Sequence, residues 1–173
     1  MSTYAKNAIV LGLLAAVGPF AVDMYLPALP TITADLGAST AATQMTLTAY
    51  FLSFGICQIV YGPVADMAGR KPPLYFGLAF FIVGAVGCAL ATSIEVLIFF
   101  RFVQGVGASA SMVIPRAVIR DLHTGVEATK LMSLVMLVLS VSPILAPLTG
   151  SALIVPFGWR AVFVAVKIGR AHV

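Results

Sequence analysis

Two ionisable residues lie inside long apolar stretches of the chain, where a charge is unfavourable. Asp23 follows Phe20-Ala-Val, and Arg101 follows Leu97-Ile-Phe-Phe. A charged side chain at the centre of a bilayer costs about 2.5–3.5 kcal/mol on insertion scales, so such residues are usually functional. Removal from water favours the neutral form of an acid. The sequence therefore predicts that Asp23 is a site of proton uptake, the alternative being a helix-end charge at the membrane surface.

Arg101 has a polar neighbour one helical turn away. Gln104 lies three residues further on, a spacing that places two side chains on the same face of a helix. We expect Gln104 to hydrogen-bond either Arg101 or a substrate. Asp23 and Arg101 lie at similar depths, so we expect both to face one cavity and to reduce the cost of each other's burial. The alternative is a structural Arg101 that extends outward to the membrane surface.

Further residues are candidates for the wall of that cavity, because methionine and aromatic side chains form adaptable apolar surfaces. With Gln104, they are Met24, Tyr25, Tyr50, Gln58 and Met112.

A short polar segment, residues 62–71, separates two apolar runs. Gly62 and Gly69, with the proline after Gly62, predict a tight turn of the backbone. Asp66 precedes Arg70 by four residues, the spacing of an ion pair on one helix face.

Two further charges follow the fourth apolar run, where the 62–71 segment should return. We expect Arg120 and Asp121 to join Asp66 and Arg70 in a cluster that latches the second and fourth spans in an outward-facing state. Loss of this latch would accompany inward opening. The alternative is a solvated ring of interface charges that contributes little.

The fifth apolar run carries small residues at a spacing of four. Ser142, Ala146 and Gly150 form one flat helix face, and Pro143 and Pro147 are expected to kink the helix. Such a face predicts close contact with a neighbouring helix.

The composition predicts an integral membrane protein of the all-α class. The 173 residues are 61% hydrophobic and 9% charged, whereas charged residues make up about 25% of soluble domains. The basic residues are dispersed, which argues against a nucleic-acid partner. The expected spans, each near the length that crosses a bilayer, are residues 7–26, 40–61, 73–91, 95–119 and 128–154, with a sixth opening at Gly158.

The basic residues are distributed unevenly between the two ends of these spans. A cytoplasmic N-terminus places Lys6, Arg70, Lys71, Arg116, Arg120 and Lys130 on the cytoplasmic side. Arg160 alone falls on the opposite side, before the end of the chain. The bias predicts that the N-terminus is inside.

The last seven residues, 167–173, do not fit the rest of the chain. A helix that enters at Trp159 would carry Lys167 and Arg170 into the bilayer. The segment can also be encoded by a DNA sequence that resembles a sequencing adapter. We therefore expect a native bundle over 1–166 and a non-native tail, the alternative being a sixth helix with functional charges.

Several of these segments resemble the signatures of one transporter family. The pattern Gly-x-x-x-Asp-x-x-Gly-Arg-Lys at 62–71 is similar to the loop between helices 2 and 3 of the major facilitator superfamily, except that Met67 stands where a basic residue is usual. Leu-x-x-x-Arg-x-x-Gln-Gly-x-Gly-Ala at 97–108 resembles its proton-transfer signature, and 133–151 resembles its antiporter motif with most glycines replaced. Residues 23–30, 142–147 and 157–163 look like the bicyclomycin and chloramphenicol resistance group.

The resemblance implies the N-terminal half of a twelve-helix drug–proton antiporter in a bacterial inner membrane. It implies Asp23 as the protonated site with Arg101 and Gln104 as partners, no cofactor beyond the proton gradient, and no enzyme activity. The partners would be a small amphipathic substrate, the bilayer and a C-terminal bundle, without which the chain should be inactive. The alternatives are an exporter of a sugar, an amino acid or another metabolite, and a membrane assembly protein without transport activity.

Overall fold

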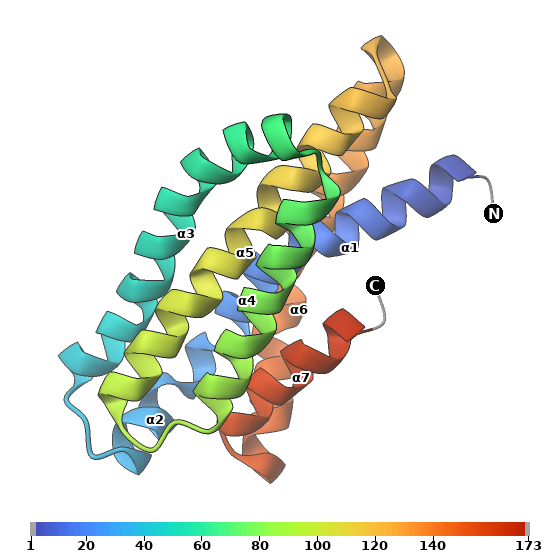
Figure 1. Cartoon of the computed structure of the whole chain (residues 1–173). Coiled ribbons are helices and arrows are strands. Elements are labelled where there is room, and N and C mark those ends of the chain that lie inside the picture. The colour runs from blue at the N-terminus through green and yellow to red at the C-terminus, as the bar shows by residue number, and fades with distance from the viewer. Residues whose placement is uncertain (1–2, 172–173) are drawn as a thin grey trace.

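The computed structural model describes the backbone of residues 3–171 and the side chains of residues 9–165. Every regular element in that backbone is helical, and the helices pack side by side into one bundle (Figure 1). The all-α prediction is therefore confirmed. The elements are α1 (Thr3–Asp23), η1 (Leu26–Ala28), α2 (Leu29–Asp35), α3 (Thr40–Ala68), α4 (Lys71–Ala89), α5 (Ile94–Leu122), α6 (Gly125–Phe157) and α7 (Arg160–Ala171).

Serine caps and glycine turns set several helix ends. Ser39 caps the start of α3, since its hydroxyl accepts a hydrogen bond from the Ala42 N–H at 3.1 Å. Ser93 caps α5 in the same way. Gly69 ends α3 and Gly158 ends α6, with φ angles of 82° and 76° that favour glycine.

The prediction of a tight turn over residues 62–71 is wrong for its first half. α3 continues through Gly62 and Pro63 to Ala68, so the turn is confined to Gly69 and the residue after it. Tyr61 and Ala65 hold this end of α3 in a cluster with buried residues of α5. That packing outweighs the single backbone hydrogen bond that a proline removes from a helix.

The segment after the first span also differs from the prediction. The span expected over 7–26 ends as a regular helix at Asp23, and the chain then forms η1 and α2. Pro27 and Pro30 lie in the first turns of these two helices. A proline is tolerated there because the first N–H groups of a helix have no intrahelical partner.

α5 lies in the middle of the bundle, in contact with α3, α4 and α1. Glycines allow this close approach. Gly105 faces Tyr50 and Ser53 of α3, and Gly107 faces Phe81 of α4; a Cβ atom at either glycine would collide with the facing helix. The position of α5 therefore depends on the lack of side chains at these points.

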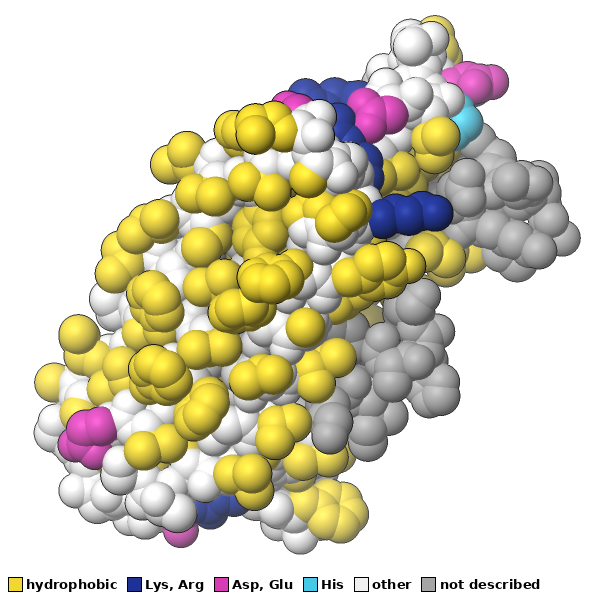
Figure 2. Space-filling model, viewed as in Figure 1, with side chains coloured by type: hydrophobic (Ala, Val, Ile, Leu, Met, Phe, Trp, Pro, Cys, Tyr) yellow, Lys and Arg dark blue, Asp and Glu magenta, His cyan; other side chains and the backbone are white. Residues whose placement is uncertain are grey.

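The bundle has an apolar side surface and charged ends. Hydrophobic side chains cover most of the face shown in Figure 2, and Lys and Arg gather near the end where α3 meets α4 and α5 meets α6. Five helical stretches among the described residues are long and apolar enough to cross a membrane. They are 9–35, 40–68, 71–89, 94–122 and 125–157. The last of these extends three residues beyond each end of the span predicted over 128–154. Residues 167–173 lie outside the described side chains, and their origin stays a prediction.

Candidate functional site

Arg101 is fully buried in the bundle, with 0% of its surface exposed. Its guanidinium lies against two tyrosine rings: the Cζ atom is 4.2 Å from the ring centroid of Tyr25 and 4.4 Å from that of Tyr50. Phe163 of α7 is further away, at 6.0 Å. Aromatic faces attract a cation, so these rings stabilise a charge inside an apolar bundle. The outward-extending Arg101 is thereby excluded.

Each tyrosine is itself held by its hydroxyl group. The Tyr25 hydroxyl shares a hydrogen bond of 2.7 Å with the Thr46 hydroxyl of α3. The Tyr50 hydroxyl donates to the carbonyl oxygen of Gly18 in α1 at 3.0 Å. The rings around Arg101 are therefore fixed by contacts between α1, α3 and the turn after α1.

Gln104 contacts Arg101 as the spacing predicted. Arg101 Nη1 donates to Gln104 Oε1 at 2.8 Å, and both side chains are buried. Within the described part of the chain, Arg101 Nε, Arg101 Nη2 and Gln104 Nε2 have no hydrogen-bond partner. The pair therefore keeps buried donors that its own contacts leave unused.

Asp23 is half-buried at the end of α1 and lines a separate small cavity. This cavity, the Asp23 cavity, has a volume of about 150 Å³, and its wall includes Tyr50, Phe51 and Phe54 of α3. Asp23 forms no ion pair with Arg101 within 4.0 Å. The expectation that the two charges face one cavity is thus not met in this structure, because Arg101 does not line the Asp23 cavity and is surrounded by tyrosine rings and Gln104.

The remaining cavity candidates do not come together around Asp23. The lining of the Asp23 cavity includes Tyr50 but not Met24, Tyr25, Gln58, Gln104 or Met112. Met24 is buried against α6, and Gln58 and Met112 are half-buried. Helix rotation, which hydropathy alone does not fix, accounts for the difference.

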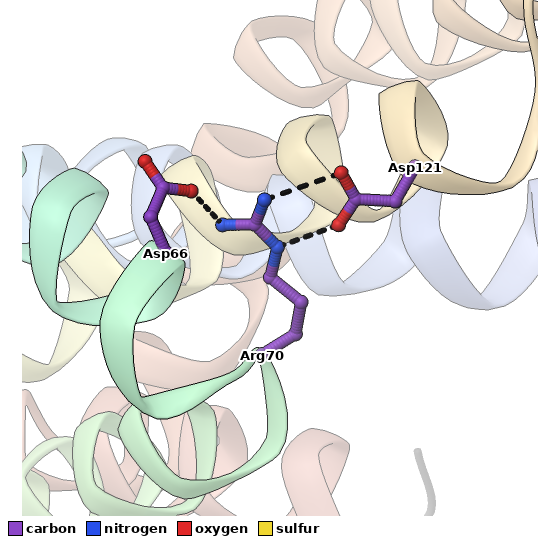
Figure 3. A network of polar contacts seen from close by, with 3 residues as sticks. All are labelled: Asp66, Arg70 and Asp121. Carbon is purple, nitrogen blue, oxygen red and sulfur yellow. Dashed lines mark hydrogen bonds and ion pairs between the residues drawn. The ribbon is translucent and has the colours of Figure 1, made fainter.

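At the end of the bundle where α3 meets α4, Arg70 joins two carboxylates (Figure 3). Its Nε and Nη2 atoms donate to the two oxygens of Asp121 at 2.7 and 3.2 Å. Its Nη1 atom donates to Asp66 at 2.6 Å. These bonds, first those to Asp121 and then those to Asp66, raise the pKa of the Arg70 guanidinium. Arg120 is exposed and takes part in none of the ion pairs found among the described residues.

The two glycines of this segment have different surroundings. Gly69 provides the turn into α4 through its positive φ. Gly62 lies inside α3, and a Cβ atom there would meet nothing within 4 Å. The cluster of Asp66, Arg70 and Asp121 therefore depends on Gly69 for its geometry and not on Gly62.

The small-residue face of α6 packs against α1, as its spacing predicted. Ser142, Ala146 and Gly150 are buried, whereas Pro143 is exposed and Pro147 is half-buried. A Cβ atom at Gly150 would collide with the backbone carbonyl of Met24. The face thus brings α6 close to the residue next to Asp23.

A polar cluster that the sequence did not predict lies at the opposite end of the bundle. Asp35 at the end of α2 accepts hydrogen bonds from Trp159 Nε1 and Arg160 Nη1, both at 2.9 Å. Arg160 Nη2 donates to the Ala91 carbonyl at 3.0 Å and lies over the Trp159 ring. The partners are more than 60 residues apart in the chain, and the sequence signal was limited to the charges themselves.

Comparisons with known proteins agree with this architecture. A family model described as Major Facilitator Superfamily matches residues 11–168. The chain is 44% identical over 90% of its length to an uncharacterised MFS-type transporter of Bacillus subtilis (strain 168). It is 37% identical over 91% of its length both to a chloramphenicol resistance protein of Pseudomonas aeruginosa and to a bicyclomycin resistance protein homolog of Haemophilus influenzae. The matches cover 39%, 37% and 40% of these relatives.

Proposed function

Because the chain belongs to the Major Facilitator Superfamily, we propose that it acts in proton-coupled export of small amphipathic molecules, drugs among them. The observation that carries the proposal is Asp23, an acid half-buried in an aromatic cavity of a membrane-spanning bundle. Desolvation and proton binding are linked, so such an acid can exchange a proton as its surroundings change. The names of relatives that refer to drug resistance support the choice of cargo.

The proposed cycle uses the two ends of the bundle differently. Asp23 binds a proton when its cavity is open to one side of the membrane and releases it on the other, while the cargo moves in the opposite direction. The cluster of Asp66, Arg70 and Asp121 latches α3 to α5 in one state and separates in the other. The uneven distribution of basic residues supports an orientation with this cluster on the cytoplasmic side, and the bacterial relatives support a bacterial inner membrane.

The cargo site requires a second wall. The chain spans about 40% of the length of the relatives it matches. We propose that a further helix bundle completes the cavity and that residues 1–173 do not transport alone. The two bundles would rock against each other around the bound cargo.

A susceptibility panel tests this function. The gene that carries this sequence, with a second bundle supplied from a relative if needed, is expressed in a bacterial host that lacks its own efflux pumps. We expect raised inhibitory concentrations for several amphipathic antibiotics, together with drug-induced proton release from energised inverted vesicles. Unchanged susceptibility with sugar- or amino-acid-induced proton movement would redirect the proposal to a metabolite exporter.

A further inference from the structure

Arg70 shows how this protein uses one edge of a guanidinium group. Its Nε and Nη2 atoms lie on the same edge and bind both oxygens of the Asp121 carboxylate. This two-point arrangement matches the planar carboxylate in geometry and charge. Arg70 therefore shows, within this protein, the geometry of a guanidinium edge that binds a carboxylate.

The same edge of Arg101 is buried and makes no such contact. Nε and Nη2 of Arg101 have no hydrogen-bond partner among the described residues, although Nη1 is bound by Gln104. Buried donors normally find an acceptor, because an unpaired one loses its bonds to water without replacement. An arginine inside a membrane span usually pairs or lines a pathway for ions or substrates.

The surroundings of Arg101 restrict what can reach this edge. The rings of Tyr25 and Tyr50 lie against the guanidinium, so an additional group must approach in its plane. The neighbouring polar group without a partner, Gln104 Nε2, is also a donor. A site that offers only donors, in a plane, with a positive charge, fits a planar anion better than a neutral or cationic group.

We propose that the Nε and Nη2 edge of Arg101 is a carboxylate-binding site and that cargo with a carboxylate group binds there. The inference rests on the proposed transport function for the role of that cargo. It concerns a site distinct from the Asp23 cavity, whose lining residues do not include Arg101. Two sources can supply the carboxylate: a small aromatic acid from outside the chain, or Asp23 after a change of conformation.

Equilibrium binding of a matched pair of probes tests the proposal. The protein is purified in detergent, and binding of radiolabelled 1-naphthoate and of its neutral analogue 1-naphthamide is measured by scintillation proximity. We expect naphthoate to bind at least about tenfold more tightly than naphthamide, because a charge-assisted pair of hydrogen bonds is lost with the amide. Equal affinity of the wild-type protein for the two probes would overturn the binding of cargo at this edge, and equal affinity in Asp23→Asn as well would overturn the site itself.

Two substitutions locate the preference at this edge. Arg101→Lys keeps the charge but removes the planar edge, so naphthoate binding should weaken by about tenfold while naphthamide binding stays unchanged. Gln104→Glu places a carboxylate next to Arg101 with little change in size, and it should compete with naphthoate if Arg101→Lys does not fold. Arg160→Lys, at the exposed cluster with Asp35, is the matched control. A preference that survives both site variants would refute the site.

Asp23→Asn distinguishes the two sources of carboxylate. If wild-type protein already prefers naphthoate, the ligand comes from outside the chain. If the preference appears only in Asp23→Asn, Asp23 occupies the edge in the wild-type protein; the carboxylate site then stands, but the binding of cargo there is overturned. No preference in either protein rejects the proposal. Because the assay needs no gradient, its failure leaves the export experiment unaffected, and failure of export leaves the binding result standing.

Discussion

The ring of Tyr50 lies against the guanidinium of Arg101, with 4.4 Å between the ring centroid and Cζ. The same ring lines the Asp23 cavity. One aromatic side chain therefore contacts the surroundings of both buried charges, and its hydroxyl ties α3 to α1 through Gly18. Movement of Tyr50 would change the environments of Asp23 and Arg101 together.

Removal of the Tyr50 hydroxyl should therefore weaken the bundle. Tyr50→Phe leaves the ring over Arg101 but deprives the buried Gly18 carbonyl of its donor, and we expect a loss of about 0.5–1.5 kcal/mol in unfolding free energy. Tyr50→Leu, which also removes the ring, should cost more. Chemical unfolding in detergent micelles measures both, with the exposed Tyr75→Phe as the control. A Tyr50→Phe protein as stable as the control would contradict this role.

Gly105→Ala should disturb the packing of α5 on α3. The added methyl group would collide with the Tyr50 carbonyl and the Ser53 hydroxyl. Overpacking of this kind costs about 1–3 kcal/mol. Gly55→Ala is the control, because a Cβ atom there meets nothing within 4 Å; it should be neutral or slightly stabilising. Equal unfolding curves for the two variants would show that α5 can move away from α3 without loss of stability.

Asp23→Asn should uncouple transport from the proton gradient. The amide has nearly the same size as the acid but does not bind a proton near neutral pH. Cargo exchange can therefore continue, while accumulation of cargo against a gradient stops. Drug-induced proton release and counterflow measure the two activities separately, in proteoliposomes that hold the chain completed by a second bundle. Glu95→Gln, an exposed acid at the start of α5, is the control. Retained proton release in Asp23→Asn would remove Asp23 from the coupling step.

Arg70→Lys should alter the transport rate more than stability. Lysine keeps the charge but lacks the two-point contact with Asp121, and exposed ion pairs contribute little to folding. We expect a several-fold slower exchange, a nearly unchanged unfolding curve, and a smaller difference at high salt because ions screen exposed charges. Lys71→Arg, next in the chain, is the control. If exchange in Arg70→Lys is as fast as in wild type, the cluster is not a latch.

Asp35→Asn should be visible in the fluorescence of Trp159, the single tryptophan of the chain. Asp35 accepts hydrogen bonds from the indole N–H and from Arg160. A neutral amide weakens both hydrogen bonds. We therefore expect the emission maximum of Trp159 to shift and to depend less on salt concentration than in the wild-type protein. Asp66→Asn, an acid at the other end of the bundle, serves as the control. Identical spectra for wild type and Asp35→Asn would mean that this cluster does not form in solution.

The sequence predicted contacts best where local spacing determines them. Asp66 and Arg70 are four residues apart at the end of α3, Arg101 and Gln104 are three residues apart inside α5, and both pairs form. The small residues Ala146 and Gly150 also marked a packed face, since close helix contact requires little side chain.

Contacts between distant helices were harder to predict. Lipid and helix core are both apolar, so hydropathy does not show which face of a spanning helix is buried. This is why the contacts of the Tyr25 and Tyr50 rings with Arg101 were not predicted. The continuation of α3 past Pro63 was missed for a related reason, because tertiary packing on α5 overrides a local helix breaker.

The guanidinium of Arg101 is buried against aromatic rings, and no described carboxylate lies within ion-pair distance of it. This arrangement also has an electrical consequence. A membrane voltage acts on any such fixed charge, with about 2.3 kcal/mol of work per elementary charge for a full crossing at 100 mV. Even a small tilt of α5 along the field would therefore perform electrical work. The balance between two conformations of the bundle would then depend on voltage, and the favoured one would place Arg101 nearer the negative side of the membrane.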